Sequence, residues 1–132
     1  MRYLLDTTWI VEYLRGNADV ISRVQALLDG GLAVSLISVA ELYEGVFRSQ
    51  DPVRNEAALK SRFIGIEGVT VLGLTEDVCV FYGRERARLY QRGNIVGAID
   101  LLIAATALTH NLTLLTDDRD FERIGDLRVN FA

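Results

Sequence analysis

The sequence predicts an α/β fold whose strands form a mainly parallel sheet. Short apolar runs alternate along the chain with longer segments in which apolar residues recur at helical spacing, and this alternation is typical of parallel α/β folds. Helix-capping residues and Gly-containing stops bound most of these segments. No repeat, low-complexity stretch or Pro/Gly-rich linker interrupts the 132 residues. We therefore expect a single domain over residues 1–132.

Short apolar runs are the predicted strands of the sheet. The first, "RYLL", is ended by Asp6 and has the apolar character of a buried strand. The fourth is followed directly by the acidic sequence "DDRD", which we expect to be a loop. The predicted sheet has five strands if the last run is counted and four if it is not. The runs cover residues 2–5, 32–37, 69–74, 112–116 and 127–131.

Three helices are predicted in the first part of the chain. Thr7 or Thr8 can cap the first helix, which extends through Leu14. Residues 18–29 have apolar positions at helical spacing and precede a Gly-Gly pair, which is typical of a helix C-terminus. Ser38 then opens the third helix, "VAELYEGVFRS".

Three more helices follow in the second part. Asp51 caps the first of them, with Pro52 at the first helical position, where proline is well tolerated. Thr75 caps a long helix that ends at Arg92. The stretch "GAIDLLIAATAL" continues to about His110 as a buried helix.

Composition and charge exclude several classes of protein. The formal net charge of −4 argues against a protein that coats nucleic acid nonspecifically, since such proteins are usually basic. Cys79 is the only cysteine, so an internal disulfide and a zinc cluster of several thiolates are excluded. No apolar run reaches the roughly 18–20 residues of a membrane span, and the N-terminus does not resemble a signal peptide. We expect a cytoplasmic protein without a membrane partner.

Acidic side chains stand at places that meet at one edge of the predicted sheet. Asp6 follows the first strand, and Glu41 lies in the first turn of the helix after the second strand. Asp100 lies near the start of its own helix, inside an apolar stretch. In open α/β sheets, ligands bind beyond the carboxyl ends of the strands. Three further acids directly follow the fourth strand, namely Asp117, Asp118 and Asp120.

Each of these acids also has a purely structural interpretation. Asp6 can simply turn the chain, and Glu41, three residues after Ser38, fits a capping box "SVAE". Asp100 can interact favourably with the positive end of its helix, and "DDRD" can be a solvated loop. These explanations are independent of one another, whereas a shared site explains all four placements together.

Carboxylates that lie close together require a shared cation to balance their negative charges. Carboxylates at one edge raise one another's pKa values, so they stay ionised together only around a cation. Oxygen ligands without His or Cys select Mg²⁺ or Mn²⁺. On this interpretation Asp100, whose burial among apolar residues would otherwise be costly, is a metal ligand.

Other reactive residues carry weaker signals. Cys79 lies within a predicted helix with no histidine nearby in sequence, and we expect it in the core. His110, the only histidine, is expected at a helix C-terminus, where a cationic side chain is favourable. The arginine-rich "RERARLYQR" is typical of a solvated helix face, with a phosphate contact as the alternative. The sequence contains no phosphate-binding glycine pattern and no nucleophile elbow.

Four motifs together resemble the PIN-domain ribonucleases, and most of all the VapC toxins of VapBC toxin–antitoxin pairs. They are "LLDTTWIVEYL", "SVAELYEGV", "GAIDLLIAATAL" and "LLTDDRDFERI", in this order and at matching spacings. The resemblance extends over essentially the whole chain. It implies a three-layer α/β/α sandwich with a central parallel sheet and an acidic Mg²⁺ site.

The resemblance also assigns site residues by position. The implied catalytic and metal-binding acids are Asp6, Glu41, Asp100 and Asp118. The pattern "TxDxDF" selects the last of these, with Asp120 as a supporting ligand and Asp117 in solvent. Thr116 and Thr8 match small polar positions that support the site.

We expect a Mg²⁺-dependent endoribonuclease that acts as the toxin of a toxin–antitoxin pair. A metal-activated water, with Mn²⁺ able to substitute for Mg²⁺, attacks a backbone phosphate in line. Arg15 and Arg119 are the candidate phosphate contacts. Single-stranded or loop RNA is the expected substrate, because an A-form duplex hides its base edges.

The expected partners are RNA, a second copy of the chain in a homodimer, and a VapB-like antitoxin. In the resembling toxins the antitoxin sends a basic side chain toward the acids, and an arginine fork matches carboxylates in bidentate fashion. We expect an apolar groove beside the site to bind this antitoxin. Its expected lining is Trp9, Val11, Tyr13, Leu14, Leu42 and Tyr43. Core packing explains Val11 and Leu42 equally well.

Three alternative functions remain open at this point. One is a PIN-like RNA-processing nuclease without an antitoxin, and another is a noncatalytic metal-binding interaction module. A phosphoacceptor signalling domain would share the acidic pocket, but its chemistry needs a lysine near the carboxylates. Lys60, the only lysine, lies within the helix after Pro52, away from the expected edge.

Overall fold

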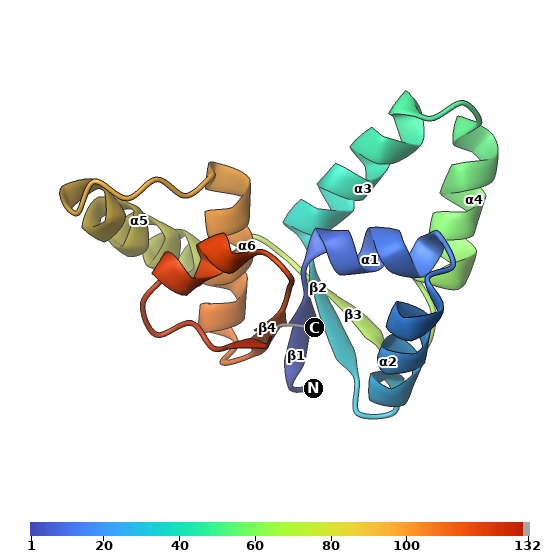
Figure 1. Cartoon of the computed structure of the whole chain (residues 1–132), viewed down its shortest axis with the longest axis horizontal. Helices are drawn as coiled ribbons and strands as arrows, with labels where there is room; N and C mark the ends of the chain where they lie inside the picture. The colour runs from blue at the N-terminus through green and yellow to red at the C-terminus, as the bar shows by residue number, and fades with distance from the viewer. Residues whose placement is uncertain (131–132) are drawn as a thin grey trace.

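A five-stranded parallel sheet forms the centre of the protein, with the strand order β3-β2-β1-β4-β5. The computed structural model describes residues 1–130. Helices cover both faces of the sheet, so the predicted three-layer α/β/α sandwich is confirmed (Figure 1). The strands are β1 (Tyr3–Leu5), β2 (Leu32–Ser35), β3 (Val69–Leu72), β4 (Thr113–Leu115) and β5 (Val129–Asn130).

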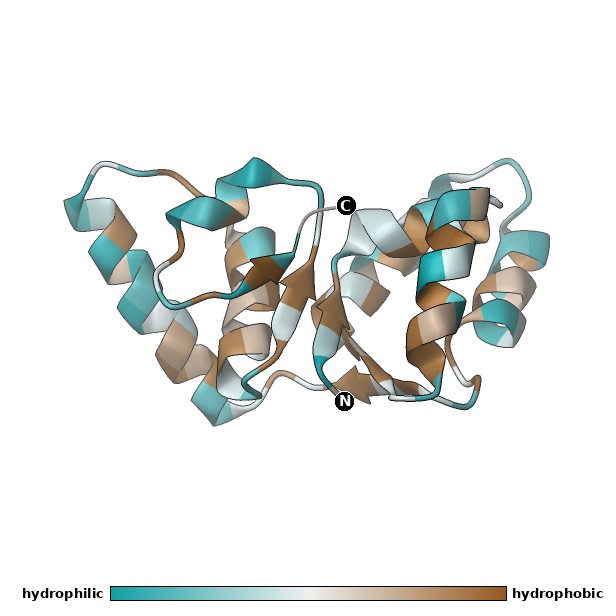
Figure 2. Ribbon diagram, turned by 60° about the horizontal axis from the view of Figure 1, so that its bottom comes forward, coloured by the Kyte–Doolittle hydropathy of each residue, from teal (hydrophilic) through white to brown (hydrophobic). Residues whose placement is uncertain are grey.

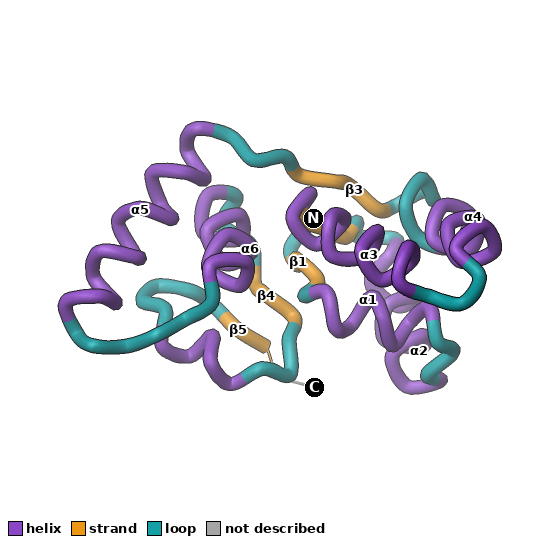
Figure 3. The backbone as a smooth tube through the Cα atoms, turned by 90° about the horizontal axis from the view of Figure 1, so that it is seen from above, coloured by secondary structure: helices purple, strands orange, loops and turns teal. Residues whose placement is uncertain are grey.

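Two groups of helices form the outer layers. The first four helices pack on one face of the sheet, whereas α5, α6 and the short 3₁₀ helix η1 pack on the other (Figures 1 and 3). The α-helices are α1 (Thr7–Leu14), α2 (Ala18–Leu28), α3 (Leu36–Arg48), α4 (Pro52–Arg62), α5 (Glu76–Gln91) and α6 (Ala98–Thr109), and η1 is Arg119–Arg123. β1 pairs with β2 on one side and with β4 on the other, so the strand order reverses between β1 and β4.

Side chains of the central strands alternate between two apolar cores. In β1, Leu4 packs into the core under α5 and α6, and Leu5 packs into the core under α1 to α4. Leu114 and Leu115 of β4 divide in the same way. The strands are accordingly apolar along their length, and the hydrophilic residues gather on the outer faces of the helices (Figure 2).

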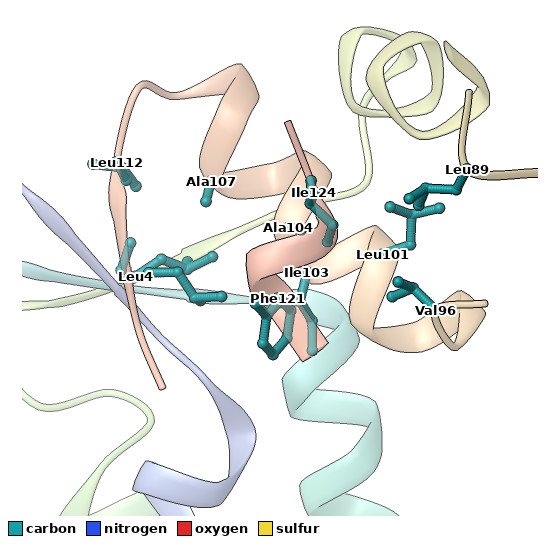
Figure 4. Close-up of a cluster of buried hydrophobic side chains, with 12 residues drawn as sticks. Leu4, Leu89, Val96, Leu101, Ile103, Ala104, Ala107, Leu112, Phe121 and Ile124 are labelled. Carbon is teal, nitrogen blue, oxygen red and sulfur yellow. The ribbon is translucent and has the colours of Figure 1, made fainter. Parts of the chain in front are cut away.

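Helix α6 is the buried helix that its apolar sequence predicts. Leu101, Ile103 and Ala104 are fully buried. They belong to one cluster with Leu4 of β1 and Phe121 of η1 (Figure 4). This packing fixes the position of the N-terminal turn of α6 relative to the end of β1.

Two predicted helix starts are wrong, and in both the capping residue lies closer to the strand. Asp6, rather than Thr7 or Thr8, caps α1 and accepts a hydrogen bond from the Thr7 backbone N–H at 2.8 Å. Ser35, rather than Ser38, caps α3 and accepts from the Ile37 N–H at 3.0 Å. The other two predicted caps, those of α4 and α5, are confirmed.

The strands are shorter than predicted because backbone pairing ends before the apolar sequence does. The β2–β3 register stops where Ser35 meets Leu72, so the apolar residues that follow Ser35 enter α3 instead. Asn130 is the last residue of β5 that the structure describes, and residue Phe131 of the predicted fifth strand lies outside the described residues.

Cys79 is exposed, so its predicted core position is wrong. Helix α5 buries only one face against α6, through residues such as Val78 and Leu89, and Cys79 lies on its outer side. In the part of the chain that the structure describes, no helix is long and apolar enough to cross a membrane.

The capping role of Ser35 leads to a stability prediction. Ser35→Ala should lower the free energy of unfolding by about 1 kcal/mol, because the first turn of α3 loses its side-chain acceptor. Chemical denaturation followed by circular dichroism measures the change. Ser22→Ala, at an exposed position of α2, is the control and should change stability by less than about 0.5 kcal/mol. Equal stabilities of Ser35→Ala and the wild type would contradict the assignment.

Candidate active site

An acidic pocket opens at the carboxyl ends of the strands, next to the reversal of strand order between β1 and β4. Its volume is about 260 Å³. Four predicted acids from four separate parts of the chain line it, namely Asp6, Glu41, Asp100 and Asp118. They come from the end of β1, from α3, from α6 and from the segment between β4 and η1. Sequence positions up to 112 residues apart (118 − 6) thus meet at one edge of the sheet.

Asp6 is a buried carboxylate held by hydrogen bonds. Its side chain is only 5% exposed. Oδ2 accepts from the Thr116 hydroxyl at 2.6 Å and from the Thr8 hydroxyl at 3.3 Å, and Oδ1 accepts from the Thr7 N–H at 2.8 Å. Burial raises the pKa of Asp6 above its usual value, and these hydrogen bonds oppose that increase.

Glu41 lies in the second turn of α3, not in the first turn as predicted, because α3 begins at Leu36. The capping-box explanation is therefore wrong. A Glu41 carboxylate oxygen instead lies 2.6 Å from the Thr7 hydroxyl, which lies 2.8 Å from the fully buried Ser38 hydroxyl. Glu41 is thus held by a tertiary contact between α1 and α3.

Asp100 lines the pocket from the first turn of α6. The capping position belongs to Gly97, which provides no side-chain hydrogen bond, and no hydrogen bond from residues 1–130 reaches the Asp100 carboxylate. Partial burial, and to a lesser extent the negative charges of Asp6 and Asp118, together raise the pKa of Asp100 to about 6. Asp100 is therefore an uncompensated carboxylate that faces other acids.

The acidic segment after β4 is more ordered than the predicted loop, because part of it forms η1. Asp118 caps η1 and accepts from the Asp120 N–H at 2.9 Å. The Asp118 N–H in turn donates to the Thr116 hydroxyl at 3.0 Å. Of the three acids, Asp118 lines the pocket, Asp117 is exposed, and Asp120 lies 3.8 Å from the Arg123 guanidinium.

The donor set of the pocket suits a hard divalent cation. Carboxylate and hydroxyl oxygens are available there, without a histidine or a cysteine. Within residues 1–130, however, no three acidic, histidine or cysteine side chains are spaced as a ready-made coordination cage. These carboxylates would therefore have to move toward a cation in order to coordinate it together.

The positively charged candidates differ in whether they line the acidic pocket. Arg15 lines the pocket and forms an ion pair with Glu12 at 3.5 Å. Arg119 does not line it and lies 2.8 Å from Glu122. Lys60 pairs with Glu56 along α4, as expected for a lysine outside the site. Arg15 is thus the better placed of the two predicted phosphate contacts.

An apolar groove of about 300 Å³ adjoins the acidic pocket. Val11, Leu14 and Leu42 line it, as predicted, together with residues of α4 such as Ala58. The other predicted lining residues do not. Trp9 and Tyr13 are buried in the core because their side chains face the sheet and α4, and Tyr43 stacks on Phe47.

Glu12 lines the pocket and was not predicted as a site residue. Two hydroxyl residues, Thr7 and Ser38, also escaped the sequence reasoning. Both were considered only as helix caps, whereas their hydroxyls connect α1 to Glu41. The run of two threonines after Asp6 was the one available signal. It does not distinguish Thr7 from Thr8, since only the tertiary contact with α3 selects Thr7.

Comparison with known proteins adds independent information. A family model of the PIN domain matches residues 3–127. The chain is 36% identical to ribonuclease VapC1 of Haemophilus influenzae over 97% of this chain and 96% of the relative. It is 29% identical to the tRNA(fMet)-specific endonuclease VapC of Shigella flexneri, over 98% and 96%. VapBC2 of Rickettsia felis, crystallised with a promoter DNA fragment, superposes with a TM-score of 0.89 at 31% identity, over 99% of this chain and 98% of that one.

The raised pKa of Asp100 leads to a pH-dependent stability prediction. Its folded-state pKa of about 6 lies above the ordinary 3.8, so the folded chain binds this proton more tightly than the unfolded chain. The free energy of unfolding therefore falls as the pH rises from about 4 to about 6 and the Asp100 carboxyl ionises. In metal-free buffer, Asp100→Asn should raise the free energy of unfolding at about pH 7.5 by on the order of 1 kcal/mol, since partial exposure screens the charges.

Urea denaturation at two pH values checks this prediction. The advantage of Asp100→Asn should disappear at about pH 4, where the wild-type carboxyl is protonated. Glu67→Gln, at an exposed position outside the pocket, is the control and should show no such pH dependence. A gain that persists unchanged at low pH would refute the electrostatic explanation.

Proposed function

This chain belongs to the PIN-domain family and is a VapC-type ribonuclease, and from this premise we propose that it cleaves RNA with a divalent cation, Mg²⁺ or Mn²⁺, as a toxin. The proposed ligands are Asp6, Glu41, Asp100 and Asp118, with Asp120 in support. The observation that carries the proposal is the meeting of four acids in one pocket, where no hydrogen bond or ion pair within residues 1–130 compensates Asp100. A cation in that position would remove the repulsion that raises the pKa of this carboxyl.

The chemistry divides between the cation and the chain. A divalent cation held by these acids would supply Lewis acidity, which would activate water for attack and offset negative charge at the scissile phosphate. Thr116 and Thr7 hold the Asp6 carboxylate, and Thr7 also holds Glu41, so these acids face the pocket in defined positions. Arg15 at the pocket rim is available to a neighbouring phosphate of a single-stranded or loop RNA.

Three alternatives are less well supported. A phosphoacceptor domain needs a lysine beside the acids, and Lys60 lies on α4 paired with Glu56. A noncatalytic module would keep the metal site without cleavage, which an assay distinguishes. A nuclease without an antitoxin would share the site and differ in the use of the groove.

Substitutions of the acids after β4 test the site assignment. Asp118→Asn should lower the rate of RNA cleavage by at least about a hundredfold, because a ligand charge is lost. Asp120→Asn should have a smaller effect, and Asp117→Asn should cleave at nearly the wild-type rate. The assay follows cleavage of tRNA(fMet) and of an unstructured RNA in Mg²⁺ or Mn²⁺.

A chelator and a matched variant control this experiment. EDTA should abolish cleavage by the wild type, and added Mg²⁺ or Mn²⁺ should restore it. Glu67→Gln removes an acid outside the pocket and should leave the rate unchanged. Full activity in EDTA would eliminate the metal mechanism, and full activity of Asp118→Asn would eliminate this residue as the fourth ligand.

We further propose that the apolar groove binds a VapB-like antitoxin. The VapBC structure from Rickettsia felis contains both partners, and this chain superposes on its toxin-like fold over nearly its whole length. Val11, Arg15 and Glu41 line both the groove and the acidic pocket, so a segment bound in the groove can reach the acids. An arginine of that segment would then compete with the cation for the same oxygens. The expected homodimer remains a prediction that light scattering can test.

Gly45 offers a test of the groove. A Cβ atom added at Gly45 meets no atom within 4 Å, and Gly45 lines the groove, so Gly45→Gln should fold normally and fill the binding surface. We expect it to bind the antitoxin at least about tenfold more weakly while RNA cleavage stays at the wild-type rate. Isothermal titration with the antitoxin encoded beside the gene measures the affinity.

Gly83→Gln is the matched control for this substitution. Gly83 is also a helical glycine with open space around its Cα, but it lies on α5, away from the groove. The control variant should keep both the wild-type affinity and the wild-type cleavage rate. If Gly45→Gln binds the antitoxin as well as Gly83→Gln does, the groove is not the docking surface.

A further inference from the structure

Among residues 1–130, Thr7 is the residue whose hydrogen bonds reach both Asp6 and Glu41. Its backbone N–H donates to Asp6 Oδ1 at 2.8 Å, and its hydroxyl lies 2.6 Å from Glu41 Oε1. These bonds come from the first residue of α1 and reach carboxylates on two different segments. The spacing between the two acids therefore depends on a single threonine.

The buried hydroxyl of Ser38 determines which way the Thr7 proton points. A hydroxyl has one proton, and Thr7 Oγ1 lies close to both Ser38 Oγ, at 2.8 Å, and Glu41. Because a carboxylate oxygen accepts, the Thr7 proton goes to Glu41, and Ser38 donates its own proton to Thr7 Oγ1. Ser38 and Glu41 are three residues apart and so lie on the same face of α3, toward the start of α1.

Hydrogen bonds also connect Asp6 with the segment after β4, but they do not extend to Asp100. Asp6 and the Asp118 backbone N–H are joined through the Thr116 hydroxyl, whereas no hydrogen bond from residues 1–130 reaches Asp100. The pocket is thus divided into a hydrogen-bonded part that contains Asp6 and Glu41 and a part that lacks hydrogen bonds, at Asp100. Positioned ligands bind a metal more tightly than mobile ones, because less order has to be imposed on binding.

We propose that Thr7, oriented by Ser38, is a positioning residue that holds Glu41 beside Asp6 and so prepares one half of the metal site. The inference rests on the proposed metal-dependent function. It assigns to Thr7 a role that neither its place as the first residue of α1 nor the acids themselves explain. Thr7 does not touch the reacting atoms, so its effect should be on metal affinity and, through it, on cleavage.

Removal of the Thr7 hydroxyl alone tests the proposal. Thr7→Val keeps the backbone N–H and the branched shape but loses the hydroxyl, and it should weaken Mn²⁺ binding by about tenfold. Thr7→Ser keeps the hydroxyl and should restore near-wild-type binding. Titration calorimetry with MnCl₂ on the intact chain measures affinity, and kcat and KM for RNA are measured at saturating and limiting Mn²⁺.

A double-mutant cycle separates positioning from a general loss of stability. In the Glu41→Gln background, Thr7→Val should cause little further loss of Mn²⁺ affinity, because both changes act on one carboxylate. Thr109→Val is the control, since it removes a hydroxyl that bonds only to the Ala105 carbonyl within α6. It should leave Mn²⁺ affinity unchanged.

The outcomes distinguish failure of this inference from failure of the proposed function. A wild type that binds no divalent cation refutes the metal-dependent function itself. A wild type that binds Mn²⁺, with Thr7→Val binding it equally well or with additive losses in the cycle, refutes only the role of Thr7. If Thr7→Val does not fold, Ser38→Ala replaces it. A loss of affinity in Ser38→Ala supports the proposal, and wild-type affinity overturns it.

Discussion

Burial of the Asp6 carboxylate at the end of β1 is the constraint on which the candidate site depends. A carboxylate that is only 5% exposed loses most of its hydration, and this loss is tolerable only with compensating hydrogen bonds. Thr116 supplies the shortest of them from the neighbouring strand's end, and the Thr7 N–H supplies another from the helix that follows. The parallel pairing of β1 with β4 is what brings Thr116 within reach.

The same network orders the pocket unequally. Hydrogen bonds through Thr7 and Thr116 connect Asp6 with Glu41 and with the backbone of Asp118. Asp100 is brought to the pocket by the packing of α6 in the core, without a hydrogen bond of its own. The packing of α6 thus places the negative charge of Asp100 near other carboxylates, and no hydrogen bond within residues 1–130 compensates this charge. On the proposed function, this repulsion reduces stability in the absence of the cation that would relieve it.

The acidic pocket and the apolar groove share part of one wall. Val11, Arg15 and Glu41 belong to both surfaces, since α1 and α3 separate the pocket from the space under α4. On the proposed function, a protein segment in the groove and RNA at the acids would compete for this wall. Inhibition by the antitoxin would then need no conformational change elsewhere in the fold.

The sequence alone determined the α/β class, most of the helices and the placement of acids near one edge, because apolar periodicity and caps are local signals. Local signals also led to errors. Ser35 and Ser38 are equally good caps by residue type, and only the end of pairing between β2 and β3 makes Ser35 the cap.

Only the tertiary structure decided what the freed Ser38 hydroxyl does, which side chains face the groove rather than the core, and that Cys79 is exposed. Each of these three features depends on which face of a helix or strand is covered by another part of the fold. That depends on contacts between residues far apart in the chain, such as Thr7 with Glu41, and periodicity within one segment does not contain this information.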